Sequence, residues 1–99
     1  MAKFVVTIRL PVVFTEHFVA LIPRHRAFIN RLIEENVVET YAISADRTQG
    51  WVTMNGEDAE TIRLVVQKFP LYAFFTNVEI NELFIFDSNH SRFPRISLN

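Results

Sequence analysis

The residue in this sequence with the strongest potential for acid–base chemistry is His25. It lies four positions after Leu21 and three and four positions before Phe28 and Ile29, which is the spacing of one apolar helix face. An imidazole that is half-buried on such a face can titrate near neutrality and transfer a proton. The alternative is a buried histidine that bonds a backbone carbonyl near the helix break at Pro23. Both interpretations direct His25 toward the interior.

A carboxylate and a guanidinium elsewhere in the chain could complete a site around this imidazole. Asp46 ends a predicted strand beside a hairpin turn, where its carboxylate could orient His25 and stabilise the charged imidazole. Alternatively, Asp46 is a turn residue bonded to its own backbone. Arg9 lies on an otherwise β-branched strand face and suits a bidentate contact with a substrate carboxylate. Its alternative is an exposed arginine, or one at a dimer interface.

Two aromatic side chains near the predicted hairpin are further candidates for binding a substrate. Tyr41 and Trp51 lie in the strands on either side of the turn, so they could line a pocket there. Aromatic residues in strands also serve packing alone, and that alternative stays open.

The sequence lacks the residues that most metal and cofactor sites require. It has no cysteine, which excludes thiolate ligands, disulfides and a cysteine nucleophile. The histidines, at positions 17, 25 and 90, have no metal-binding spacing, and there is no glycine-rich phosphate loop. We therefore expect no cofactor and no metal, and we expect any chemistry to be proton transfer by side chains.

Length and charge narrow the class of protein further. A chain of 99 residues forms one domain, and a net charge of −1 gives no general attraction to nucleic acid or anionic lipid. The first residues have no signal-peptide pattern, and no stretch approaches the roughly 20 apolar residues of a membrane span. We expect a cytoplasmic protein with no nucleic-acid and no membrane partner.

The elements that must position these side chains follow from the spacing of apolar residues. Residues 4–10 are rich in β-branched types and stop at Pro11, which predicts a first strand whose alternate residues face opposite sides. Residues 15–35 predict a helix that Thr15 caps and that should kink or restart at Pro23. The apolar face of the strand carries Phe4, Val6, Ile8 and Leu10, and the opposite face carries Val5, Thr7 and Arg9.

The rest of the chain predicts an antiparallel hairpin, a second helix and a long aromatic last strand. In the last strand the alternation of apolar and polar residues shifts by one position, which indicates a bulge. The hairpin covers residues 37–46 and 51–54 with a turn at 47–50, the helix runs from cap residues at 55–58 to about Phe69, and the last strand covers 74–86 with its bulge near Asn81 and Glu82.

The element order β-α-β-β-α-β is typical of the ferredoxin-like α+β fold, a four-stranded antiparallel sheet with two helices on one face. We expect one such domain over residues 1–86 and a polar tail over residues 87–99. The chain is 49% hydrophobic and has ten phenylalanines, while one face of the sheet is left without helices. We therefore expect aromatic residues on the open face and in the last strand, and a homodimer that covers this face.

Two groups of short motifs resemble known protein families, and together they cover most of residues 3–86. The end of the first strand and the approach to the last strand resemble the muconolactone isomerase family. The segment around His25 and the hairpin resemble the related YCII-like proteins. The motifs are Leu10-Pro11-Val12, Phe69-Pro70-Leu71-Tyr72, Val78-Glu79-Ile80 and Leu83 for the first family, and Pro23-Arg24-His25-Arg26-Ala27-Phe28-Ile29, Ala45-Asp46 and Gly50 for the second.

The resemblance implies a dimeric α+β barrel, often assembled into larger rings. Muconolactone isomerases shift a double bond in a small lactone carboxylate by removing and returning a proton, without a cofactor. In YCII-like proteins a His–Asp pair occupies a pocket between the first helix and the sheet, and the matching residues here are His25 and Asp46. The sequence departs from both patterns, with Ile43-Ser44-Ala45 where many YCII-like proteins are glycine-rich and Ala73-Phe74-Phe75 in a looser end motif.

These observations support one function class and leave two others open. The first is a cofactor-independent enzyme that acts on a small anionic molecule by isomerase-like proton transfer, in a pocket between the first helix and the sheet. The alternative is a non-catalytic, small-ligand-binding or structural homodimer. RNA binding shares this topology but is disfavoured, because the net charge is −1 and Thr53 stands where a second stacking aromatic residue is expected.

Overall fold

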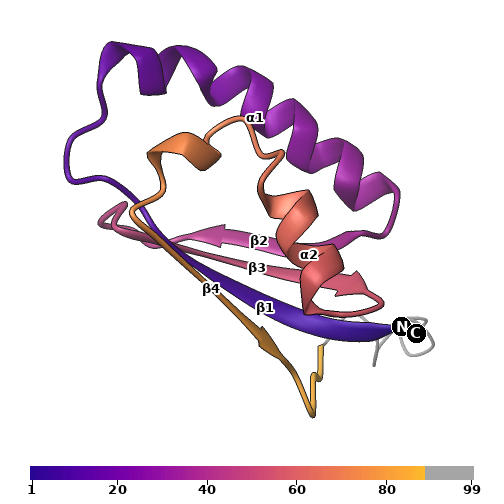
Figure 1. The fold of residues 1–99 in the computed structure, drawn as a ribbon. Coiled ribbons are helices and arrows are strands. Elements are labelled where there is room, and N and C mark those ends of the chain that lie inside the picture. The colour runs from indigo at the N-terminus through magenta and orange to yellow at the C-terminus, as the bar shows by residue number, and fades with distance from the viewer. Residues whose placement is uncertain (89–99) are drawn as a thin grey trace, which may run out of the picture.

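The computed structural model describes residues 1–88, in which two α-helices and a short 3₁₀ helix accompany four strands (Figure 1). The strands are β1 (Ala2–Arg9), β2 (Val38–Ile43), β3 (Gln49–Gly56) and β4 (Asn77–Glu82). The helices are α1 (Glu16–Glu34), α2 (Ala59–Val66) and the 3₁₀ helix η1 (Tyr72–Phe74). The predicted polar tail, apart from residues 87 and 88, lies outside the described residues.

The four strands form one antiparallel sheet in the order β2-β3-β1-β4. The helices α1 and α2 lie on the same side of this sheet (Figure 1). The predicted ferredoxin-like β-α-β-β-α-β arrangement is therefore confirmed. β1 lies inside the sheet, so it pairs with β3 along one edge and with β4 along the other.

The first strand shows how the sequence separates the two faces of the sheet. In β1, Phe4, Val6 and Ile8 are buried under the helices, whereas Val5 and Thr7 are half-buried on the opposite face. The predicted alternation is confirmed, since successive strand residues point to opposite faces. The hydrophobic core on the helix side continues with Leu10, Ile29, Leu32, Val38, Val52, Met54, Ile62, Val66 and Phe69.

The helix α1 runs without interruption through Pro23. Thr15 caps its N-terminus as predicted, because the Thr15 hydroxyl accepts a hydrogen bond from the Phe18 amide at 3.2 Å. The predicted restart at Pro23 does not occur. A proline inside a helix removes one backbone hydrogen bond, but α1 buries Phe18 before Pro23 and Ile29 after it. Packing of both halves against the same sheet keeps them in one helix.

The hairpin between β2 and β3 differs from the prediction at its turn. Gly50, predicted to be a turn residue, lies within β3, and its φ is not positive. A Cβ atom at Gly50 would lie 2.9 Å from Cδ1 of Ile43, which is well inside the contact distance of two carbon atoms. Gly50 therefore makes room for Ile43 instead of allowing a tight turn.

The predicted last strand over residues 74–86 is too long. Residues before it form η1, and β4 covers only Asn77–Glu82. Its first aromatic residues, Phe74 and Phe75, pack toward the helices instead, whereas Phe84 is exposed and the Phe86 ring lies against the Lys3 ammonium group. The rings of Phe74 and Phe18, for example, have centroids 5.4 Å apart. Burial against α1 thus overrides the strand propensity at the start of this segment.

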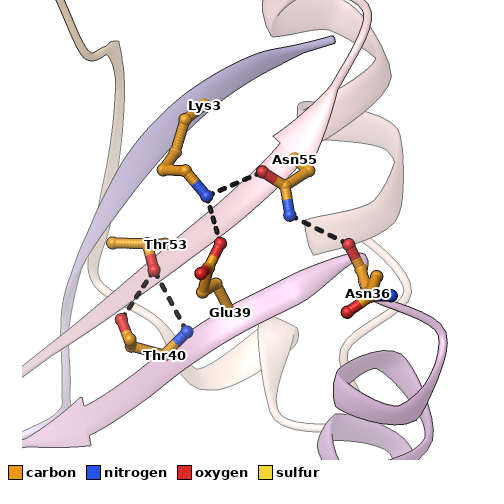
Figure 2. A network of polar contacts seen from close by, with 6 residues as sticks. All are labelled: Lys3, Asn36, Glu39, Thr40, Thr53 and Asn55. Carbon is orange, nitrogen blue, oxygen red and sulfur yellow. Dashed lines mark hydrogen bonds and ion pairs between the residues drawn. The ribbon is translucent and has the colours of Figure 1, made fainter. Parts of the chain in front are cut away.

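The irregular position in the sheet is also different from the predicted one. The expected bulge near Asn81 and Glu82 is absent, since β4 pairs with β1 in continuous register. The register shift lies in β2, between Val38 and Thr40. Figure 2 shows a polar network around this shift, formed by Lys3, Asn36, Glu39, Thr40, Thr53 and Asn55.

This network joins three strands to the connection that follows α1. The Lys3 ammonium group bonds the Glu39 carboxylate and, at 2.9 Å, the side-chain oxygen of Asn55. The Asn55 amide group donates to the backbone carbonyl of Asn36 at 2.9 Å. The Thr53 hydroxyl accepts a hydrogen bond from the Thr40 backbone amide at 3.0 Å. A side chain therefore satisfies a backbone group beside the shift, where the regular ladder is disrupted.

The face of the sheet opposite the helices, called the open face below, is more polar than predicted. Of the aromatic residues in the strands, only Trp51 lies on it, opposite Thr7 of β1. The expectation that the open face holds much of the aromatic excess is therefore wrong for the strands. Instead, aromatic side chains pack on the helix side, where they include Phe4, Phe14, Phe18, Phe28, Tyr41, Phe69, Tyr72 and Phe75.

Candidate functional site

His25 lies inside the protein, on the side of α1 that faces the sheet. It is one helical turn before Ile29 and two turns after Phe18, and all three residues are buried. Only 2% of the His25 surface is exposed. The inward orientation expected from helical spacing is therefore the one observed.

The hydrogen-bond partner of His25 is Tyr41 of β2. The Nε2 atom of His25 and the hydroxyl oxygen of Tyr41 are 2.9 Å apart. Tyr41 faces the helices because it pairs with Val52, which is fully buried on that side. The second imidazole nitrogen, Nδ1, is buried and has no hydrogen-bond partner among the described residues. One hydrogen bond thus holds the imidazole, and one of its polar atoms is left unsatisfied.

Both members of this pair are neutral at neutral pH. Burial lowers the pKa of His25 from 6.5 to about 4, and the positive charge of Arg26 adds to this effect. Burial also raises the pKa of Tyr41, and Arg26 opposes that shift to a smaller extent. A neutral imidazole and a neutral phenol share one hydrogen bond, in which the tautomer of His25 decides the donor.

The pair lines a small space between α1 and the sheet, called the inner cavity below. Its volume is about 170 Å³. The walls are mainly apolar, and the rings of Phe69 and Phe75 have centroids 5.6 and 6.4 Å from that of His25. The residues that line it are Ile8, Leu10, Phe14, Phe18, Ile22, His25, Arg26, Tyr41, Ile43, Arg47, Leu71 and Phe75.

A larger depression, called the outer hollow below, adjoins the inner cavity where β1 ends. Its volume is about 570 Å³, and polar and apolar residues share its walls. Leu10, Phe14 and Arg47 line both spaces, so these residues form the boundary between them. The outer hollow is lined by Arg9, Leu10, Pro11, Val12, Phe14, Asp46, Arg47, Thr48 and Thr76.

Asp46 lines the outer hollow and does not pair with His25. One oxygen of its carboxylate accepts hydrogen bonds from the hydroxyls of Thr48 and Ser44, at 2.7 and 2.8 Å, and from the Thr48 amide at 3.1 Å. These bonds lower the pKa of Asp46. The predicted His25–Asp46 pair is therefore not formed, because donors of its own loop hold one carboxylate oxygen of Asp46 at the outer hollow, whereas His25 lines the inner cavity. The turn role that the sequence left open is the one observed.

The residues predicted to bind substrate lie in three different places. Tyr41 lines the inner cavity, Arg9 lines the outer hollow, and Trp51 lies on the open face of the sheet. The alternation of β3 explains the position of Trp51, since the next residue, Val52, is fully buried on the helix side. Trp51 therefore contributes to neither space.

Two arginines of the inner cavity, Arg26 and Arg47, are not identified by sequence spacing. Arg26 follows His25 on the helix, and its long side chain reaches the cavity although the residue is mostly exposed. Arg47 lies in the hairpin connection, where the sequence indicates only a turn. The arginine itself is a usable signal, because turn positions of this kind favour glycine, asparagine or aspartate. An arginine there indicates that its side chain has a role.

Residues 1–88 contain neither a metal-binding cluster nor a membrane-spanning helix. No group of three or more His, Asp or Glu side chains in this range lies close enough together to hold a metal ion. None of the helices in the same range has both the length and the hydropathy that a membrane span requires.

Comparison with known proteins finds similarity at the level of structure. No protein-family model and no curated protein matches the sequence, so the motif resemblances stay predictions. Among solved structures, 5-chloro-2-hydroxyhydroquinone dehydrochlorinase from Burkholderia phenoliruptrix, in complex with 2,5-dihydroxybenzoquinone, matches with a TM-score of 0.67. The match covers 89% of this chain and 97% of that chain, at 12% sequence identity. It supports the ferredoxin-like α+β fold.

Proposed function

We propose that this protein is a cofactor-independent enzyme that moves a proton within a small anionic ring compound, in an isomerase-type reaction. The observation that carries the proposal is the His25–Tyr41 hydrogen bond of 2.9 Å on the wall of a cavity of about 170 Å³. This arrangement combines a proton-transfer pair with a mainly apolar space, which is the usual composition of a small-molecule site. Arg26 and Arg47 add positive charge to the same wall.

The pair can carry out the complete proton shift by itself. The Tyr41 oxygen takes a proton from a ring carbon beside a carbonyl group, while the Tyr41 hydroxyl proton moves to Nε2 of His25. The electron pair of the broken C–H bond moves toward the carbonyl oxygen and forms an enolate. Tyr41 then returns a proton to a different ring carbon and recovers its own proton from His25. The double bond has moved, and no proton or electron is gained or lost.

An anionic substrate would make His25 a better base. Burial holds the pKa of His25 at about 4, which favours the neutral imidazole. A negative charge placed in the inner cavity stabilises the imidazolium and so raises this pKa. Since a general base works best with a pKa near the operating pH, the substrate itself would adjust His25 for the reaction.

The ligand of the structural neighbour supports the same class of substrate. Its structure contains 2,5-dihydroxybenzoquinone, a single ring with several oxygen atoms. The inner cavity has the size for such a ring, because a cavity of about 150 Å³ in another protein binds benzene and this one measures about 170 Å³. We therefore place an oxygenated, single-ring compound in the inner cavity.

Phenol and an unsaturated five-membered lactone that carries a carboxylate are suitable first probes of this site. We expect either to raise the thermal unfolding temperature, because a ligand that binds only the native state stabilises it by about 2.7 kcal/mol at 100 times its Kd. Ile22→Trp, which fills the inner cavity, should abolish the shift. Ile33→Trp, on an exposed part of the same helix, should keep it. If neither probe shifts the transition, or if the shift survives in Ile22→Trp, the inner cavity is not the site.

A non-catalytic binding protein is the second function to test. The observation that favours it is the unsatisfied Nδ1 of His25, which leaves a protonated imidazole without an acceptor on that side among the described residues. Incorporation of deuterium from heavy water into a bound lactone separates the two functions. An enzyme of the proposed kind exchanges the carbon-bound hydrogen, whereas a binding protein shifts the unfolding temperature without exchange.

We also propose that the open face pairs with that of a second copy to form a homodimer. Val5, Thr7 and Trp51 lie near one another on this face, where they are only partly covered. Sedimentation equilibrium should give a mass twice the 11.6 kDa of the chain. Trp51→Arg should shift the protein toward the monomer, while Ile33→Arg, on the helix side of the molecule, should leave the dimer intact. A wild-type monomer at high concentration would refute the pairing.

A further inference from the structure

Arg47 has a backbone conformation that arginine rarely adopts. Its φ is 64°, and within residues 1–88 only Asn36, at 63°, is another non-glycine residue with positive φ. Asparagine tolerates this left-handed region comparatively well, whereas a longer side chain pays about 1–2 kcal/mol for the crowding of its Cβ. Glycine would avoid this penalty. Because arginine is present at position 47 despite this penalty, we expect its side chain to have a function.

The loop around Arg47 is built to hold this conformation. The Arg47 amide donates to the Ser44 carbonyl at 2.9 Å. The Ser44 hydroxyl oxygen accepts from the Thr48 and Gln49 amides at 3.2 and 3.1 Å, and the Asp46 carboxylate accepts from both groups of Thr48. Hydrogen bonds on both sides of Arg47 thus fix its backbone, and its side chain leaves from a defined position.

That position is the boundary between the two spaces of the site. Arg47 lines both the inner cavity and the outer hollow, and no other charged residue lines both. Arg9 lines the outer hollow, and neither arginine forms an ion pair within the described part of the chain. Asp46, the one carboxylate that lines the outer hollow, already accepts three hydrogen bonds from its own loop. The boundary therefore offers a guanidinium with free donors.

We propose that Arg47 determines the specificity of this site by binding the carboxylate of a ring carboxylate whose ring occupies the inner cavity. The inference rests on the proposed function, since it takes the inner cavity as the ligand site. Guanidinium and carboxylate form paired, charge-assisted hydrogen bonds of fixed geometry. A ring that fills the inner cavity and bonds Tyr41 at one end directs its other end toward the boundary, where Arg47 meets the carboxylate. Arg9 adds positive charge on the side of the outer hollow.

Calorimetric titration with two matched probes tests this role. Phenol and p-hydroxybenzoate share the hydroxylated ring, and only the second carries a carboxylate. We expect the wild-type protein to bind p-hydroxybenzoate at least about tenfold more tightly, as one charge-assisted contact provides. Arg47→Gly and Arg47→Asn should lose this preference while still binding phenol, and their stability toward urea should not fall, because both residues tolerate positive φ.

Asn36→Gly is the control, since it changes the other left-handed residue, which lines neither space. It should retain the preference for p-hydroxybenzoate. The role of Arg47 is refuted if the wild type binds both probes equally, if the preference survives in both Arg47 variants, or if these variants lose phenol to the same extent. In each of those cases, if the wild type still binds phenol, only the role of Arg47 is refuted and the proposed function is not. Failure of the wild type to bind either probe refutes both proposals.

Discussion

Tyr41→Phe is expected to reduce the rate of proton transfer by about 10²–10⁴-fold, the usual contribution of a positioned acid–base group. The substitution keeps the ring and removes the hydroxyl that lies 2.9 Å from Nε2 of His25. Without it, both nitrogens of the buried imidazole lack a partner among the described residues. We expect the free energy of unfolding to fall by about 1–3 kcal/mol for that reason. Deuterium incorporation into the lactone and urea unfolding measure the two effects.

The matched control for this substitution is Tyr72→Phe. Tyr72 lies in η1, packs against Phe75 with ring centroids 5.9 Å apart, and does not line the inner cavity. We expect this variant to keep both the exchange rate and the stability. If Tyr41→Phe exchanges the lactone as fast as the wild type does, the hydroxyl is not part of the proton path. If its stability is also unchanged, the hydrogen bond to His25 contributes nothing measurable.

The second large effect expected is a loss of stability in mild acid. The pKa of a histidine is ordinarily 6.5, and that of His25 is about 4 in the folded protein. Between these two values the unfolded chain binds a proton that the folded protein does not bind, so unfolding becomes more favourable as the pH falls. The folded state therefore keeps its full stability above about pH 6.5. It should lose about 3 kcal/mol as the pH falls to 4, a consequence of a pKa difference of this size.

Urea unfolding at a series of pH values measures this loss. His25→Gln cannot titrate, so its unfolding free energy should stay flat between pH 6.5 and 4, the two values that bound the titration of His25. His17→Gln, an exposed histidine on the same helix, should keep the wild-type slope. Asp46 and Asp58 also have lowered pKa values, but they affect stability only at lower pH, because the ordinary pKa of an aspartate is already 3.8. A wild-type slope in His25→Gln would show that other groups cause the acid sensitivity.

Much of the fold could be predicted because local patterns and tertiary packing agree in most of the chain. The alternation of β1 and the helical spacing of α1 each give one buried face, and Thr15 gives a cap where the structure has one. The predictions failed where packing overrides local preference. Pro23 stays inside α1 because both halves pack on the sheet, and Phe74 joins η1 because its ring packs near Phe18.

The candidate site shows more clearly what the spacing of residues in the sequence cannot predict. Helical spacing was enough to direct His25 inward, since burial of a helix face is a local property. Its partner is set by the register of β2 on β3, which places Tyr41 opposite Val52 on the helix side. Asp46 was the expected partner, yet donors within its own loop hold its carboxylate. A pairing across elements depends on register, and sequence spacing along one element does not contain that information.

The central position of β1 links the site to the course of folding. β1 comes first along the chain, but its neighbours in the sheet are β3 and then β4, the last strand described. The inner cavity likewise takes its lining from Ile8 at one end of the domain to Phe75 near the other. A chain that ends before Phe75 therefore lacks part of the cavity wall, and a ligand of the cavity stabilises only chains made beyond that point. In a cell that supplies the ligand, binding would select completed molecules over unfinished ones and protect them from proteolysis.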